Sequence, residues 1–298
     1  MKVCGKEIRV DGKLIRTARL AADGYEFLED PAAAIAGLRK APARIDLFTF
    51  VQALPHTKPQ HGYPLEWDNV AAVSVSTFEQ WWDEQINFKV RNKVRLAAKR
   101  GVCVSVVPFD DALVQGISSI YNESPVRQGR PFPHYGKAIE IVRKENGTFL
   151  ERSVFLGAFF EGRMIGFAKL ASDEARMQAG LMQILSMSQH REKAPTNALI
   201  AGAVRSCAER RIPYLVYSQF AYGKKQRDSL SDFKEANGFK KIEVPRYYCP
   251  LTTMGALALR CGFHHRLADR VPEAVAGRLR RFRAGWYARR LATPKAAF

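Results

Sequence analysis

The residues best suited to chemistry gather in two segments, and the first is a loop rich in basic and aromatic side chains. Between residues 124 and 137 the chain carries Arg127, Arg130, His134 and Tyr135 among prolines and glycines. We expect these side chains to approach a ligand rather than to pack; a charged surface loop is the alternative. The loop is not a nucleotide-binding P-loop, because its glycines are too far apart and neither Ser nor Thr follows its lysine.

The second segment, residues 181–220, has the pattern of a strand, a polar loop, a helix and a strand. Pro195 suits the first turn of the helix, where Thr196 or Asn197 can accept a backbone N–H. A unit of this length is a parallel crossover, which places the helix N-terminus beside the carboxyl end of the first strand. That position offers N–H groups and a positive dipole to an anion. A capped helix without a ligand is the alternative.

The composition is strongly basic, with 47 Lys and Arg against 29 Asp and Glu and a net charge of +18. This charge attracts RNA, DNA, anionic lipid or phosphorylated substrates without choosing among them. No apolar run approaches the roughly 20 residues that span a bilayer, and the first residues lack the apolar core of a signal peptide. We therefore expect a cytoplasmic protein, with peripheral association at the inner membrane face as an option. The five scattered cysteines predict reduced core residues.

Other catalytic and metal signatures are absent. The chain has no Gly-x-Ser-x-Gly, Gly-x-Gly-x-x-Gly, His-Glu-x-x-His or Cys-x-x-Cys motif. His56 and His61 lie in a loop with no cysteine or carboxylate cluster nearby. His264 and His265, beside Cys261, are too close together and too few for a zinc site. We therefore expect no metal.

The elements that position these residues begin with a hairpin around Asp11-Gly12, a helix over 31–38 capped by Asp30, and strands over 45–51 and 70–75. One helix then runs from residue 78 to about residue 100, starting at a Thr77 capping box. Its basic second half would lie on a phosphate backbone or be simply solvated. A buried strand follows over 102–107.

From residue 110 onward the pattern predicts a helix, three antiparallel strands, a helix, a strand, a helix over 229–236 and a final strand. The first two antiparallel strands form a hairpin that turns at Glu161-Gly162. The segment past residue 252 is rich in arginine, with apolar and aromatic residues between the charges. Such a segment binds a membrane surface, nucleic acid or a partner, or else packs on the body with a solvated arginine face.

Two motifs in this order of elements resemble the GNAT acyltransferase superfamily. Glu161-Gly-Arg-Met-Ile-Gly-Phe is similar to its central hairpin, and Phe233-Lys-Glu-Ala-Asn-Gly-Phe is similar to its late aromatic signature. The resemblance covers about 108–251 and implies an α/β fold, a GNAT-like mixed sheet flanked by helices. It implies a smaller, degenerate GNAT-like half over 1–107, an acyltransferase domain over 108–252 and a basic helical tail over 253–298.

Two departures from the GNAT pattern resemble the FemAB-like aminoacyl transferases. The loop before the crossover helix lacks the glycine that brings backbone N–H groups against the coenzyme A pyrophosphate. Lys234 stands where many GNAT enzymes place a tyrosine general acid, and FemAB-like enzymes carry a similar Phe-Lys pair in the substrate cavity. Those enzymes have two GNAT-like halves. However, this chain is short for the group and lacks the helical hairpin that some members use for tRNA.

The resemblance implies N-acyl transfer from an activated donor, acyl-CoA first, to an amine on a small molecule or glycan precursor. One alternative is aminoacyl-tRNA-dependent transfer to a cell-wall or polysaccharide precursor; another is an inactive scaffold that binds RNA or anionic membrane. Catalysis requires the strands at 183–188 and 215–220 to separate around the acyl carbonyl. The expected roles are catalytic for Lys234, Tyr217 and His134, donor-binding for Gln189, Arg191, Lys193, Thr196 and Asn197, and substrate-binding for Arg127, Arg130, Tyr135, Gln183 and Tyr222.

Overall fold

The computed structural model describes residues 1–127, 129–221 and 229–265, together with 278, 282 and 286. Its strands are β1 (Lys2–Val3), β2 (Lys6–Asp11), β3 (Thr17–Leu20), β4 (Leu47–Val51), β5 (Leu65–Ser74), β6 (Cys103–Val107), β7 (Val126–Arg127), β8 (Arg130–Pro131), β9 (Ser153–Phe160), β10 (Arg163–Ser172), β11 (Gln178–Ser186), β12 (Tyr214–Val216) and β13 (Lys240–Pro250). Its α-helices are α1 (Pro31–Arg39), α2 (Phe78–Gln80), α3 (Phe88–Lys99), α4 (Asp111–Tyr121), α5 (Ile139–Asn146), α6 (Pro195–Glu209), α7 (Ser229–Ala236) and α8 (Thr253–Arg260). A π-helical turn (Trp81–Gln85) and 3-10 turns at Leu150–Arg152 and Ser188–Lys193 complete the set.

Tyr222 and most of the predicted basic tail lie outside the described residues. Within the described part, no helix combines the length and the apolar character needed to cross a bilayer.

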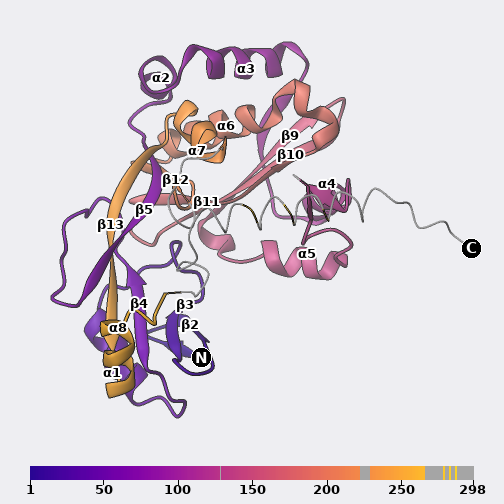
Figure 1. Ribbon diagram of the computed structural model, residues 1–298. Helices are drawn as coiled ribbons and strands as arrows, with labels where there is room; N and C mark the ends of the chain where they lie inside the picture. The colour runs from indigo at the N-terminus through magenta and orange to yellow at the C-terminus, as the bar shows by residue number, and fades with distance from the viewer. Residues whose placement is uncertain (128, 222–228, 266–277, 279–281, 283–285, 287–298) are drawn as a thin grey trace, which may run out of the picture.

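One mixed sheet of 11 strands runs through the molecule in the order β1-β2-β3-β4-β13-β5-β12-β11-β10-β9-β6 (Figure 1). The final strand, β13, pairs antiparallel with both β4 and β5. β5 in turn pairs antiparallel with β12. Two strands from the first 107 residues therefore enclose β13, the last strand of the described residues, and the predicted mixed sheet flanked by helices is confirmed.

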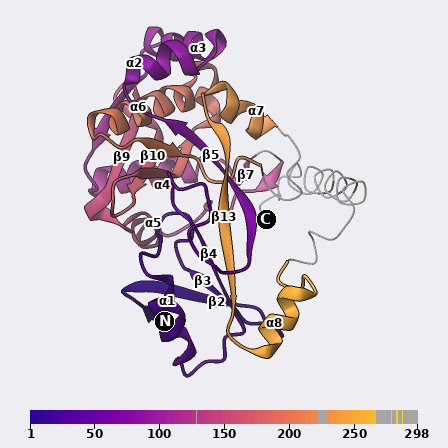
Figure 2. The same cartoon turned by 90° about the vertical axis from the view of Figure 1, so that its left-hand side faces the viewer.

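The helices cover both faces of this sheet. α6 packs on β9, β10 and β11, and α3 packs on the outside of α6. α4 also packs on β10 but lies on the opposite side of it from α6 (Figure 1). α8 follows β13 and lies at the other end of that strand from α7 (Figure 2).

The main hydrophobic core draws on both sides of residue 107. Val73 and Trp81 belong to the same buried cluster as Phe167 and Leu199. A smaller hydrophobic cluster contains buried apolar residues between Val3 and Phe50, together with Tyr247 and Cys249 of β13. The predicted boundary between 107 and 108 thus falls inside one core, and the three-domain division stays a prediction.

Most predicted elements are confirmed. The hairpin of β9 and β10 turns at residues 161–162, and Asp30 caps α1 by accepting from the Ala33 N–H at 2.9 Å. Pro195 opens α6 as predicted. The cap of α6 is different: Ala194 occupies that position with φ of 52° and without a side-chain hydrogen bond. Thr196 and Asn197 therefore do not cap this helix.

Three other expectations need correction. The long helix over 78–100 is interrupted, because Ile86 has extended backbone angles and Asn87 starts α3 as a new N-cap. β6 is an edge strand with mostly exposed residues rather than a buried strand. The helix α5 was not expected: it is only eight residues long and begins without a side-chain cap.

The cysteines are all free, but only two of them are core residues. Cys207 and Cys249 are buried, and burial raises the pKa of each thiol to about 12. Cys4, Cys103 and Cys261 are exposed, which corrects the expectation that all five are buried.

Candidate active site

β11 and β12 separate soon after they begin to pair. Their parallel register covers three residues each and ends at Gly180 and Val216, whereas β11 continues to Ser186. Beyond β12 the chain stays on β5, because the Tyr217 N–H donates to the Ala71 carbonyl at 2.7 Å and the Ala71 N–H donates to the Ser218 carbonyl at 2.9 Å. The predicted separation of the two strands is confirmed.

Lys234 lies beside this opening and is fully buried. Its ammonium donates to the carbonyl of Gln219, just past β12. The same ammonium lies 4.7 Å from the centre of the Tyr217 ring, and that ring packs edge-on against Phe239 at 5.7 Å. α7 and the end of β12 thus bring two of the three predicted catalytic residues together.

The third, His134, lies on the β11 side of the opening. Its ring stacks on Tyr121 with 4.5 Å between centroids, and the Tyr121 hydroxyl donates to Gln183 Oε1 at 2.8 Å. Burial, then the charge of Lys137, lowers the pKa of His134, so the imidazole is neutral at pH 7. An ammonium group can only donate, so the 3.2 Å contact from Lys137 occupies Nδ1 as an acceptor and leaves the proton on Nε2. His134 therefore has no free acceptor nitrogen for a general base.

The carboxylate of Glu123 occupies the backbone N–H groups just after β11. Its Oε2 accepts from the Ser188 N–H at 2.8 Å and its Oε1 from the Gln189 N–H at 2.9 Å. Arg127 donates to Oε2 at 3.0 Å. Sequence reasoning missed Glu123, although its four-residue spacing from Arg127 is typical of a helical ion pair. An internal anion thus fills the first amides of the loop that the GNAT resemblance assigns to the donor phosphate.

Arg127 is held inside the protein rather than turned toward solvent. Its guanidinium donates to the carbonyls of Ser186 at 3.0 Å and Ile120 at 2.7 Å. It also lies over the Phe132 ring at 4.6 Å, and burial lowers its pKa. Arg127 therefore ties the 124–137 loop to α4 and β11. Arg130 and Tyr135, by contrast, are exposed on that loop.

The predicted donor-binding residues divide into exposed and internally bonded groups. Gln189 and Arg191 are exposed. Lys193 pairs with Glu192 at 3.0 Å and lies over the Phe160 ring at 4.4 Å. The two α6 residues bond within the protein: Thr196 Oγ1 lies 2.7 Å from Ser186 Oγ, and Asn197 Nδ2 donates to Asn237 Oδ1 at 3.1 Å. Asn197 thereby links the start of α6 to the end of α7, next to Lys234.

No protein-family model and no curated protein matched the chain. Solved structures do match it. The chain covers 86% of L-PGS from Bacillus licheniformis with 89% of its own length, at 13% identity and a TM-score of 0.57. It covers 83% of the C-terminal domain (DUF2156) of a putative lysylphosphatidylglycerol synthetase from Agrobacterium fabrum with 85% of its length, at 14% identity and a TM-score of 0.54.

A third match is a tandem GNAT protein from the clavulanic acid biosynthesis pathway, with 12% identity, a TM-score of 0.47, and coverage of 82% of this chain and 78% of that one. Likeness at such low identity concerns the fold. The chain shares the fold of the first two structures, a mixed sheet flanked by helices as expected.

Proposed function

We propose that the chain transfers an aminoacyl group from its ester with tRNA to an amine or hydroxyl of an acceptor. The acceptor atom attacks the ester carbonyl carbon in the opening between β11 and β12. The tetrahedral intermediate then expels the ribose oxygen of the tRNA, so the acceptor loses one proton and the leaving oxygen gains one. In this proposal the Lys234 ammonium stabilises the negative charge that develops on the carbonyl oxygen.

The position of Glu123 favours an aminoacyl ester over acyl-CoA as the donor. A coenzyme A pyrophosphate at these amides would have to displace a carboxylate bound to two N–H groups and to Arg127. Hydrogen bonds to charged groups contribute about 1.5–3 kcal/mol each. An aminoacyl ester carries no pyrophosphate beside its carbonyl and does not need this position. Two structural neighbours favour the same class of transfer: one is L-PGS and the other is a domain of a putative lysylphosphatidylglycerol synthetase.

Two classes of acceptor are compatible with this transfer. The neighbours' names favour a lipid hydroxyl such as that of phosphatidylglycerol, whereas the FemAB resemblance favours an amine on a cell-wall or glycan precursor. A net charge of +18 suits both a tRNA donor and an anionic membrane. Peripheral membrane association through the basic tail belongs to this proposal.

Thermal-shift measurements on the whole chain test the donor. We expect charged tRNA to raise the unfolding temperature and acetyl-CoA to leave it unchanged. Glu123→Ala is the matched variant: it frees the N–H groups of Ser188 and Gln189, so weak binding of acetyl-CoA is expected in the variant alone. Stabilisation of the unmodified chain by acetyl-CoA and not by charged tRNA would replace the proposed donor with acyl-CoA.

Transfer itself is measured as radiolabel passing from charged tRNA into phosphatidylglycerol vesicles, free amines or cell-wall precursors. Lys234→Met should lower turnover by about a hundredfold or more, while Lys241→Met, at an exposed lysine of β13, should not. Circular dichroism of both variants separates lost activity from lost fold. Absence of any transfer, together with salt-sensitive RNA or vesicle binding, would favour the inactive scaffold instead.

A further inference from the structure

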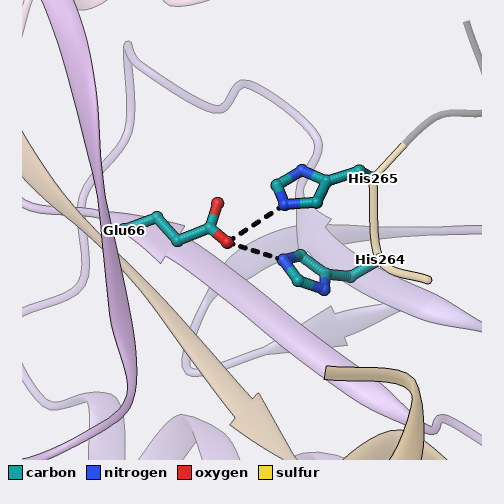
Figure 3. A group of neighbouring side chains, drawn as sticks. All are labelled: Glu66, His264 and His265. Carbon is teal, nitrogen blue, oxygen red and sulfur yellow. Dashed lines mark hydrogen bonds and ion pairs between the residues drawn. The ribbon is translucent and has the colours of Figure 1, made fainter. Parts of the chain in front are cut away.

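Two histidines and a glutamate meet on a part of the molecule that the proposed transfer does not use. Glu66 lies on β5, and His264 and His265 lie in the turn after α8 (Figure 3). Nε2 of His264 is 2.8 Å from Glu66 Oε1, and Nε2 of His265 is 3.1 Å from the same oxygen. One ligand atom from each residue lies within 4.8 Å of the others. Three groups that bind metals therefore converge on one point.

His264 is buried more completely than its hydrogen bonds justify. Its side chain is 3% exposed, and its ring packs edge-on against Tyr248 at 4.8 Å. Nε2 contacts Glu66, but Nδ1 is buried without a hydrogen-bond partner in the described structure. A desolvated imidazole with one satisfied nitrogen is costly. A coordinate bond at Nε2 would supply stabilisation that the single hydrogen bond does not.

We propose that Glu66, His264 and His265 bind a divalent transition-metal ion of the zinc class. Tetrahedral zinc with ligands about 2.0–2.1 Å away separates neighbouring ligand atoms by about 3.3 Å. The two nitrogen–oxygen distances in the cluster are within about half an ångström of that value. On binding, the proton on each Nε2 leaves that nitrogen for Nδ1 or solvent, and the freed lone pair faces the metal together with the carboxylate.

The donor set selects the class of ion. Two imidazole nitrogens with one carboxylate suit zinc and its first-row neighbours, whereas magnesium and calcium prefer oxygen ligands. Glu66 and His265 are 40% and 43% exposed, so solvent has access and can fill the remaining coordination position. The ion would join residues 198 positions apart and so fix the turn after α8 to β5. This role is separate from the proposed transfer.

The test uses the whole chain after treatment with a chelator. Calorimetric titration with Zn²⁺ should show one site, and Co²⁺ should give the visible absorption of a tetrahedral nitrogen–oxygen site. Glu66→Gln and His264→Gln should each weaken Zn²⁺ binding by about a hundredfold, since each removes one of three ligands. His56→Gln is the matched control, because His56 is exposed and belongs to no such group among the described residues. It should bind Zn²⁺ as the unmodified chain does.

A second readout avoids dependence on variants. Zn²⁺ should protect His265, which is 43% exposed, from modification by diethyl pyrocarbonate, mapped by mass spectrometry, while His56 remains reactive. The proposal is overturned if Zn²⁺ does not protect His265, or if Glu66→Gln and His264→Gln bind Zn²⁺ as tightly as His56→Gln. Transfer activity does not enter either measurement, so failure here leaves the proposed function untouched.

Discussion

Lys169 is a buried cation that donates to two backbone carbonyls and one hydroxyl. Its side chain in β10 is 2% exposed, and its ammonium donates to the carbonyls of Asn146 at 2.8 Å and Thr148 at 2.6 Å. The Thr148 hydroxyl accepts a third hydrogen bond at 2.8 Å. Burial outweighs the other influences and lowers the pKa of Lys169 to about 8. Among the described residues no carboxylate bonds to this ammonium, so protonation remains costly in the folded chain.

Stability should therefore rise with pH in the alkaline range because of this one residue. Between pH 8 and pH 10.5 the folded lysine has lost a proton that the unfolded lysine still holds, so the free energy of unfolding increases with pH. The gap between the two pKa values corresponds to at most about 3 kcal/mol. Urea unfolding at several pH values should show this rise in the unmodified chain relative to Lys169→Met. Parallel pH profiles for the two proteins would contradict it.

Single residues also show where sequence reasoning reaches its limit. The types and order of Lys234, Tyr217 and Gln183 pointed to the two strand ends that the structure places around one opening. Arg127 was chosen for the same reasons, yet the fold uses it internally, because a basic side chain does not reveal which carbonyls will surround it. Glu66 is a third potential metal ligand, distant in sequence from His264. No sequence pattern near either residue predicts that they lie in contact.

Among the elements, the helix after β5 shows how a local signal can be overridden. The apolar stripe from Phe78 to Ala97 continues across Ile86 in the sequence, but the chain turns there. Arg91 holds the interruption: its Nη1 donates to the carbonyls of Trp82 at 2.9 Å, Asp83 at 3.0 Å and Ile86 at 3.2 Å. Asn87 accepts from the Val90 N–H at 2.9 Å, and an asparagine at this position is a signal from which a second helix start could have been predicted.

Removing the Arg91 guanidinium should loosen this interruption. Arg91→Ala leaves three carbonyls at a helix end without their charged donor, so we expect a loss of about 1–3 kcal/mol in the free energy of unfolding. Lys93→Ala changes an exposed residue of the same helix and should cost less than about 0.5 kcal/mol. Urea denaturation of the two variants measures the difference. Equal costs would mean that the carbonyls do not depend on Arg91.

The elements that could be predicted were those whose own sequences carry recognisable N-cap or turn residues. α1 and α4 begin at Asp30 and Asp110, whose side chains accept backbone N–H groups within the first turn. β9 and β10 turn at Glu161-Gly162 and bury consecutive residues along their central parts. β6 was misjudged because a run of valines does not reveal whether a strand lies at the edge or the centre of a sheet. Its place is set by the strands that pair with β9.

At the scale of the whole molecule, β5 decides how the two parts of the chain combine. It lies between β12 and β13, and the indole N–H of Trp81, soon after it, donates to the Asn237 carbonyl at 3.1 Å. Arg246 of β13 reinforces the junction by pairing with Asp68 of β5 and with Asp23, each at 2.9 Å. Sequence patterns indicate strands but not their long-range partners, so this interleaving was not predictable from periodicity.

The interleaving predicts that residues 108–252 do not fold independently. This fragment lacks β4 and β5, so one edge of β12 is unpaired and β13 loses both of its neighbours. The main core also loses Val73, Trp81 and Val90. We expect the fragment to show no cooperative thermal transition by circular dichroism, whereas residues 1–265 should unfold in a single transition. A cooperative transition of the fragment near the unfolding temperature of the longer chain would mean that the boundary at 107 separates autonomous domains, and that β5 is a docked strand rather than part of the folding unit.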